Sequence, residues 1–146
     1  GTDWDAHGDL IGNHNRMARE YDQPVGALLK DLEERGLLQD TLVMGVTEFG
    51  RTPVAQGAGK KGRDHHPNCF TCWMAGAGVK RGFDYGMTDE LGYAAASEYR
   101  VGHADIHATI HHLLGLDYKR NTFYYEGRDE SLVGVTPARV LREILA

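Results

Sequence analysis

The stretch TLVMGVTEFGRTP, residues 41–53, indicates the fold class most strongly. Its first seven residues form a short apolar run rich in strand-favouring residues, which predicts a buried and parallel β-strand. The charged residues Glu48 and Arg51 follow directly, at the predicted end of that strand. A second apolar run, CFTCWMA at residues 69–75, predicts a second buried strand.

Helical patterns surround the two predicted strands. Capping residues and apolar periodicity predict three helices. The first begins near Asp22, with Pro24 in its first turn and Gly36 as its stop. The second runs from about Asp105 to Leu114 with Gly115 as its C-cap, and the third opens at Thr136-Pro137 and continues through Leu145. Residues 1–16 mix Gly, Asp, Asn and His without a sustained period, so we expect a loop there. Helices that alternate with buried strands predict an α/β fold with a mostly parallel sheet, formed by residues 1–146 as a single domain.

The composition excludes several classes of protein. The chain carries 16 Lys and Arg against 21 Asp and Glu, a net charge of −5, whereas a nucleic-acid-binding surface is basic. No apolar run approaches the roughly 20 residues that span a membrane, and two cysteines are too few for a disulfide scaffold. The first residues are polar and show no Met or signal-peptide pattern, so we expect a piece of a longer protein.

Carboxylates and histidines gather in three predicted loops. They are Asp5 and His7 before the first predicted helix, Glu48 after the first strand, and Asp64, His65 and His66 before the second strand. Zn²⁺, Mn²⁺ and similar ions prefer this mixture of ligands, so the three loops together predict a metal site. Asp-x-His triplets are common by chance, and a structural or solvated role for Asp5 and His7 is the alternative.

Arg51 and a basic loop near it favour an anionic substrate. The planar guanidinium of Arg51 suits an oxyanion such as phosphate or sulfate, and pairing with Glu48 is the alternative. Lys60, Lys61 and Arg63 would attract the same substrate, unless they form only a solvated, mobile loop.

Two further clusters, one of histidines and one of cysteines, are weaker candidates for metal binding or redox chemistry. His103, His107 and His111 recur every four residues and share one helix face. Of these, His103 and His107 are candidates to face the site, and a solvated polar stripe is the alternative. Cys69 and Cys72 have the spacing of a redox or zinc motif, but within a strand they point to opposite faces, which favours core packing.

Several short motifs follow one another in an order that is specific as a set. They are DAHG at 5–8, TEFGRTP at 47–53, GRDHHP at 62–67, AGAGVKRG at 75–82, DIHATIHHLLGLD at 105–117 and GRD at 127–129. The set resembles the C-terminal part of a large sulfatase-like family of secreted bacterial proteins, which carries a domain-of-unknown-function name and belongs to the alkaline-phosphatase-like superfamily. The resemblance spans nearly all of the chain.

This resemblance implies a metal-dependent hydrolase that acts on phosphate or sulfate esters and is secreted or periplasmic. By position, Asp5 and His7 resemble the first ligand pair of the superfamily. Glu48 stands where a further carboxylate ligand is expected, and His65 resembles the last histidine. The implied cofactor is a divalent ion such as Zn, Mn, Ca or Mg, and the implied partner is an anionic ester.

Phe49 is the main departure from the family pattern. It stands where a histidine is expected to follow Glu48, so one metal site would be either weakened or rebuilt with Asp64 or His66. The nucleophile region of the superfamily has no counterpart here, which places it outside this chain. The competing interpretations are a secreted binding or structural protein that kept the fold and lost the chemistry, which Phe49 favours, and a self-contained small metal-binding domain.

Overall fold

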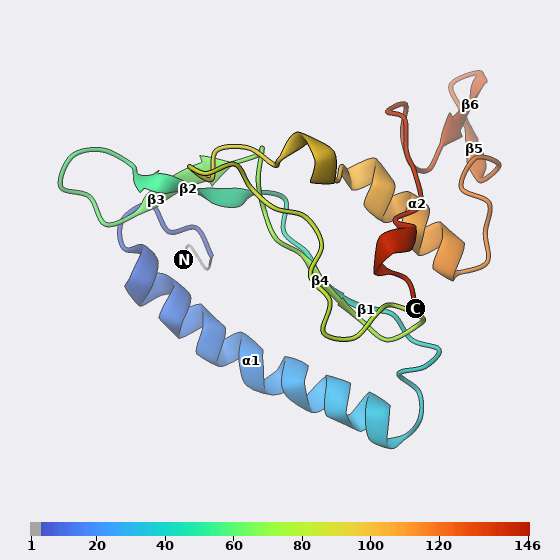
Figure 1. Ribbon diagram of the computed structural model, residues 1–146, viewed down its shortest axis with the longest axis horizontal. Helices are drawn as coiled ribbons and strands as arrows, with labels where there is room; N and C mark the ends of the chain where they lie inside the picture. The colour runs from blue at the N-terminus through green and yellow to red at the C-terminus, as the bar shows by residue number, and fades with distance from the viewer. Residues whose placement is uncertain (1–3) are drawn as a thin grey trace. The chain divides into compact units, whose positions relative to one another are not determined.

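The structure is a computed structural model that describes residues 4–146. These residues form two α-helices, three two-stranded β-sheets and two short 3₁₀ helices, η1 (Ser97–Tyr99) and η2 (Arg142–Ile144) (Figure 1). The chain divides into two compact units. The first unit comprises Gly1–Ala77 and Met87–Ala96, and the second comprises Gly78–Gly86 and Ser97–Ala146.

The predicted parallel α/β fold is wrong, and with it the alkaline-phosphatase-like architecture. All three strand pairs among the described residues are antiparallel. The run at 41–47 forms only β1 (Val43–Gly45), which pairs with β4 (Trp73–Ala75) from the second predicted strand. Both strands are three residues long and half-buried, whereas a parallel sheet requires strands that are covered on both faces.

Helix α1 (Leu10–Glu34) begins far earlier than the predicted start near Asp22. Its N-cap is Asp9, whose carboxylate accepts a backbone hydrogen bond from the first turn (3.2 Å). The predicted loop is therefore confirmed for residues 4–9 and wrong for the residues that follow. Pro24, expected in the first turn, lies inside the helix.

The predicted end of the first helix is confirmed. The helix stops at Glu34, and Gly36 adopts a φ of +70°, a conformation that glycine reaches without strain. The N–H of Leu37 then donates to the carbonyl of Leu32 (2.8 Å), which satisfies a helix-terminal carbonyl.

A β-hairpin of β2 (Gly50–Ala55) and β3 (Arg63–His66) was not predicted. Arg51 lies directly opposite His65 across the pair, so both side chains project from the same face. The register shifts between Arg51 and Ala55, where Pro53 has no N–H to donate to the ladder.

In the second unit, the predicted helix is confirmed as α2 (His103–Leu113). Gly115 follows it with a φ of +73°, as expected of its capping role. The predicted C-terminal helix is wrong: of residues 136–145, only Arg142–Ile144 form a single 3₁₀ turn.

The second unit also contains an unpredicted hairpin of β5 (Thr122–Tyr125) and β6 (Arg128–Ser131). Its two turn residues, Glu126 and Gly127, have φ values of +47° and +88°. A two-residue turn with both φ values positive matches the right-handed twist of paired strands.

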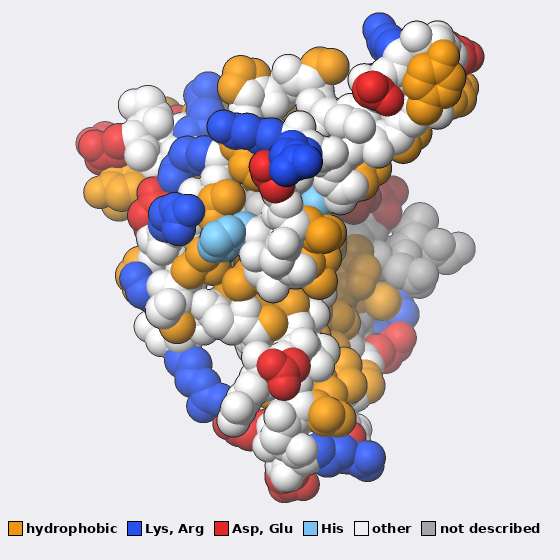
Figure 2. All heavy atoms as spheres, turned by 90° about the vertical axis from the view of Figure 1, so that its right-hand side faces the viewer, with side chains coloured by type: hydrophobic (Ala, Val, Ile, Leu, Met, Phe, Trp, Pro, Cys, Tyr) orange, Lys and Arg blue, Asp and Glu red, His pale blue; other side chains and the backbone are white. Residues whose placement is uncertain are grey.

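Few apolar side chains are buried among the described residues. They are Ala6, Ile106, Ala108 and Leu141. Figure 2 accordingly shows hydrophobic side chains spread among charged ones on the face that it presents. No helix in residues 4–146 is both long and apolar enough to cross a membrane.

Candidate metal centre

The loop at residues 4–9 is held against the start of β3. The N–H of Arg63 donates to the carbonyl of Ala6 (3.0 Å), and Gly62 is buried beside the same loop. A Cβ at Gly62 would overlap the backbone carbonyl of His7, so only glycine allows this approach. The contact brings two segments that are far apart in the sequence to the same place.

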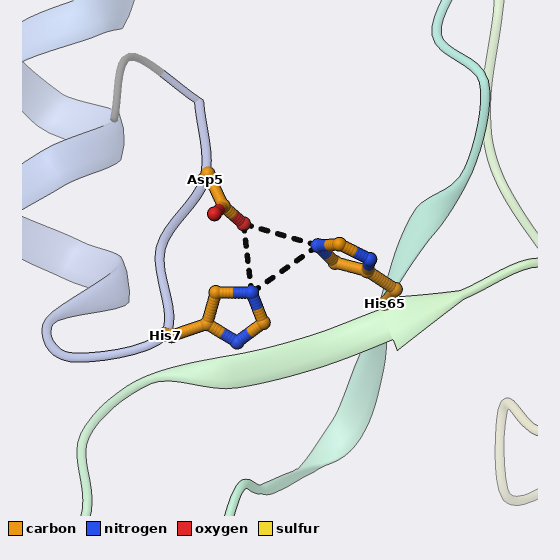
Figure 3. Close-up of side chains that lie close together, drawn as sticks. All are labelled: Asp5, His7 and His65. Atoms are coloured by element: carbon orange, nitrogen blue, oxygen red, sulfur yellow. Dashed lines mark hydrogen bonds and ion pairs between the residues drawn. The ribbon is translucent and has the colours of Figure 1, made fainter. Parts of the chain in front are cut away.

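Three predicted metal ligands meet at this contact. Nε2 of His7 lies 2.8 Å from Oδ1 of Asp5, and Nε2 of His65 lies 3.0 Å from the same oxygen. The two Nε2 atoms are 3.2 Å apart. Figure 3 shows the three side chains pointing toward one another, Asp5 and His7 from the loop and His65 from β3. Among residues 4–146, this is the one group of three such side chains whose ligand atoms converge.

The spacing of the three atoms suits a metal ion. Nitrogen and oxygen ligands at about 2.1 Å from one ion lie about 3.0–3.4 Å apart at octahedral to tetrahedral angles. The observed separations of 3.0 and 3.2 Å lie within this range, and the separation of 2.8 Å lies just below it. One carboxylate and two imidazoles also form a ligand set that suits Zn²⁺, Mn²⁺ and Fe²⁺.

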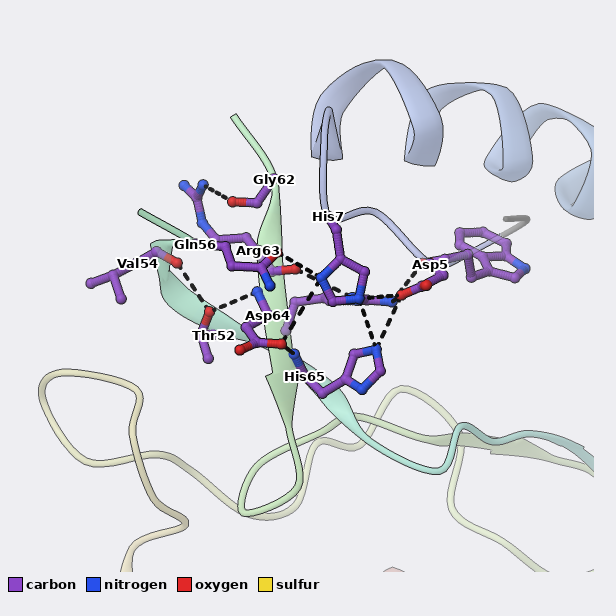
Figure 4. A network of polar contacts seen from close by, with 11 residues as sticks. Asp5, His7, Thr52, Val54, Gln56, Gly62, Arg63, Asp64 and His65 are labelled. Atoms are coloured by element: carbon purple, nitrogen blue, oxygen red, sulfur yellow. Dashed lines mark hydrogen bonds and ion pairs between the residues drawn. The ribbon is translucent and has the colours of Figure 1, made fainter. Parts of the chain in front are cut away.

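The other ring nitrogen of His7 has a hydrogen-bond partner that fixes its tautomer. Nδ1–H donates to Oε1 of Gln56 (2.6 Å), and Oδ1 of Asp64 lies 3.9 Å from the same nitrogen (Figure 4). In a neutral His7, Nε2 therefore carries a lone pair that faces Asp5. Lone pairs of His7 and Asp5 at 2.8 Å repel unless a proton or a metal ion lies between them. A histidine that donates one ring N–H to an acceptor and presents its other nitrogen as a ligand is typical of metal sites.

Asp5 stays ionised over a wide pH range. The hydrogen bond from His65, and then that from Arg51, lower the pKa of Asp5 to about 2. Its carboxylate is therefore available as a ligand without first losing a proton.

Arg51 lies beside the three predicted ligands and is mostly buried, with 14% of its side chain exposed. Nη2 donates to Oδ1 of Asp5 (2.9 Å) and to the carbonyl of Trp4 (3.0 Å), and Nη1 donates to the carbonyl of Arg63 (3.3 Å). The guanidinium thus bonds to protein acceptors at both terminal nitrogens. The predicted contact of Arg51 with a substrate oxyanion stays a prediction.

Three other predicted ligands lie outside the group. Glu48 is exposed and accepts a hydrogen bond from the hydroxyl of Thr47 (3.2 Å). Asp64 accepts from the N–H of His65 (2.8 Å) and reaches only the far side of His7. His66 is buried, and its Nε2–H donates to the carbonyl of Gly92 (3.0 Å), on the face of β3 opposite to His65.

The remaining candidates belong to other environments. His103 and His107 are exposed residues of α2 in the second unit, and the carbonyl of His107 accepts a hydrogen bond from Nδ1–H of His111 (2.7 Å). Cys69 and Cys72 are free and half-buried. Burial raises the pKa of the Cys72 thiol, which makes this thiol less reactive at neutral pH.

Sequence reasoning missed Gln56. An amide in a Gly-rich loop has no motif of its own. The available signal was the histidine itself, since a ligating imidazole requires an acceptor for its second nitrogen.

The chain belongs to a defined protein family. The family model described as "Protein of unknown function (DUF1501)" matches residues 1–145. That match carries no link to the alkaline-phosphatase-like superfamily. No curated protein and no solved structure matched the chain.

Proposed function

We propose that the protein is a metal-dependent hydrolase of phosphate or sulfate esters, with Asp5, His7 and His65 as its metal ligands. The observation that carries the proposal is the convergence of their three ligand atoms within 3.2 Å of one another. The ordered motifs that resemble a sulfatase-like family supply the substrate class. A secreted or periplasmic location goes with the same resemblance.

The site is open enough for a substrate. The side chains of Asp5, His7 and His65 are 44%, 37% and 42% exposed. Structural zinc sites have four protein ligands, whereas catalytic sites have three and leave positions for water and substrate. Three exposed protein ligands therefore favour a catalytic site over a structural one.

A divalent ion bound there would polarise an ester oxygen and lower the pKa of a bound water or of a nucleophile. The chain's own residues prepare the site for it. Asp5 supplies a permanent negative charge, Gln56 holds His7 in the tautomer that presents Nε2, and Arg51 fixes the orientation of the Asp5 carboxylate.

The direct test is ester hydrolysis with added ions. We expect turnover of p-nitrophenyl phosphate or p-nitrophenyl sulfate that requires Zn²⁺, Mn²⁺, Ca²⁺ or Mg²⁺ and is lost with a chelator. Asp5→Ala and His65→Ala should each reduce turnover at least about 100-fold. His112→Ala is the matched control, because His112 is an exposed histidine of the second unit. Activity that survives both ligand substitutions would overturn the proposal.

A second candidate is a non-catalytic binding protein with a degenerate metal site. The observation that favours it is the position of Glu48 and Asp64, which lie outside the group of converging ligand atoms. This candidate predicts that the protein binds a metal ion and hydrolyses neither class of ester. Metal-dependent turnover would exclude it.

A further inference from the structure

Phe49 stands where the resemblance to a sulfatase-like family implies a histidine, and its ring lies against one of the proposed ligands. Its ring stacks on the imidazole of His65 with the ring centroids 4.0 Å apart and the planes 23° apart. Phe49 is half-buried, whereas the His65 side chain is 42% exposed. The exposed imidazole therefore has a flat hydrophobic support on one face.

Such a support has a physical consequence for a histidine ligand. Rotation of an imidazole about its second side-chain torsion is soft, so the direction of Nε2 is poorly fixed unless neighbours hold the ring. A flat ring in van der Waals contact restricts this rotation, whereas an aliphatic side chain of similar volume has no flat face. The stack thus aims Nε2 of His65 at the position where Asp5 and His7 converge.

Arg51 contacts both the Phe49 ring and the Asp5 carboxylate. Its guanidinium carbon lies 5.6 Å from the centroid of the Phe49 ring, a cation–π distance. Its Nη2–H donates to Asp5 at 2.9 Å, and its remaining contacts with backbone carbonyls keep it in place. This mostly buried cation therefore supports a carboxylate ligand directly and a histidine ligand through an intervening ring.

We propose that Phe49 and Arg51 form a positioning pair that aligns His65 and Asp5 for metal binding. The inference rests on the metal site proposed above and assigns two residues that hold its ligands without touching the ion. Phe49 then has a defined task and is not the trace of a lost ligand. Arg51 acts on a ligand in this account, and not on the substrate.

The test measures metal affinity without substrate. Zn²⁺ is titrated into the wild-type protein and into Phe49→Leu, Phe49→Tyr and Arg51→Lys, and Co²⁺ absorption reports the ligand geometry. Phe49→Leu and Arg51→Lys should each raise the Zn²⁺ Kd about 10–100-fold and change the Co²⁺ spectrum, as the loss of ligand-supporting contacts does elsewhere. Phe49→Tyr keeps the flat ring, so its Zn²⁺ Kd and its Co²⁺ spectrum should match those of the wild-type protein.

Phe123→Leu is the matched control, since Phe123 is an exposed aromatic residue on β5 in the second unit. It should leave the Zn²⁺ Kd unchanged. In the metal-free protein, Phe49→Leu should also remove the upfield ring-current shift of the His65 ring protons.

Wild-type affinity in Phe49→Leu, with an unchanged Co²⁺ spectrum, would overturn the role of Phe49. If that variant does not fold, Phe49→Tyr decides the role: wild-type Zn²⁺ affinity supports it, and weakened affinity overturns it. If Arg51→Lys lowers the rate of hydrolysis but leaves the Zn²⁺ affinity unchanged, the positioning role of Arg51 is overturned. That result would instead indicate that Arg51 contacts the substrate. Failure of the wild-type protein to bind any divalent ion would instead overturn the metal site itself, so the two failures are distinguishable.

Discussion

Nδ1 of His7 lies 2.6 Å from Oε1 of Gln56, on the side of the ring that faces away from Asp5. This contact assigns the proton of a neutral His7 to Nδ1 and leaves Nε2 free to bind a metal ion. Gln56→Met should therefore weaken Zn²⁺ binding about 10-fold, because His7 loses the acceptor that fixes its tautomer.

Gln56→Glu provides the opposite change at the same position. A carboxylate accepts from Nδ1–H more strongly than an amide does and makes Nε2 more basic, so Zn²⁺ affinity should be equal to or higher than in the wild-type protein. Calorimetric titration of both variants measures the effect. Equal losses in the two variants would show that position 56 matters only for packing.

Gly62 is the residue that allows the loop at 4–9 to approach β3. Gly62→Ala should destabilise the protein by about 1–3 kcal/mol and weaken metal binding, because its Cβ would overlap the carbonyl of His7. Gly8→Ala is the control, since a Cβ at Gly8 meets no atom within 4 Å. Urea unfolding combined with Zn²⁺ titration separates the two effects. A Gly62→Ala variant as stable as Gly8→Ala would contradict the close approach.

Thr109 is fully buried in the second unit, and its hydroxyl both donates and accepts a hydrogen bond. Oγ1 donates to the carbonyl of Asp105 (2.7 Å) and accepts from the N–H of Leu141 (2.9 Å). Thr109→Val should cost about 1–3 kcal/mol, because the N–H of Leu141 is left buried without a partner. Thr109→Ser keeps both bonds and should cost about 1 kcal/mol for the lost methyl group. Urea unfolding that gives the reverse order would contradict this role of the hydroxyl.

Glu143 makes the stability of the second unit depend on pH. A backbone hydrogen bond within its own residue, and then the Arg139 guanidinium, lower the pKa of Glu143, and the hydroxyl of Tyr85 also donates to it (3.0 Å). A carboxyl whose pKa is lower in the folded state stabilises the protein above its unfolded-state pKa of about 4.3. That contribution is lost as the pH falls from there through the lower, folded-state pKa.

Thermal unfolding of the wild-type protein and of Glu143→Gln tests this dependence. The wild-type protein should have the higher Tm at pH 7, and the difference should shrink steadily below about pH 4. A Tm difference that stays constant down to pH 3 would contradict the lowered pKa of Glu143.

Parts of the fold could be predicted because local residues determine them. Gly36 and Gly115 end their helices in conformations that other residues adopt only with strain, so both ends could be predicted from the sequence. The orientation of β1 could not, because an apolar run records burial and not the direction of the partner strand. The hairpin at 122–131 does carry a local signal, an aromatic run followed by Glu126 and Gly127, which periodicity alone did not reveal.

Some features of the candidate site could likewise be predicted from the sequence, and others could not. Asp5, His7 and His65 were predicted because their side chains carry ligand chemistry wherever they lie. Their convergence depends on a contact at Gly62, and a glycine among the many glycines of a loop gives no sign of what it approaches. The sequence likewise shows only that Phe49 stands where a ligand is expected, and not that its ring lies on His65.

The proposed metal site consists of Asp5, His7 and His65 and would hold one divalent ion. The most direct measurement is the stoichiometry of Zn²⁺ binding to the metal-free protein, compared between the wild-type protein, His65→Ala and His112→Ala. We expect one ion for each chain in the wild-type protein and in His112→Ala, and at least about a 100-fold loss of Zn²⁺ affinity in His65→Ala. Equal Zn²⁺ affinity in all three proteins, or no binding to the wild-type protein, would contradict this proposal.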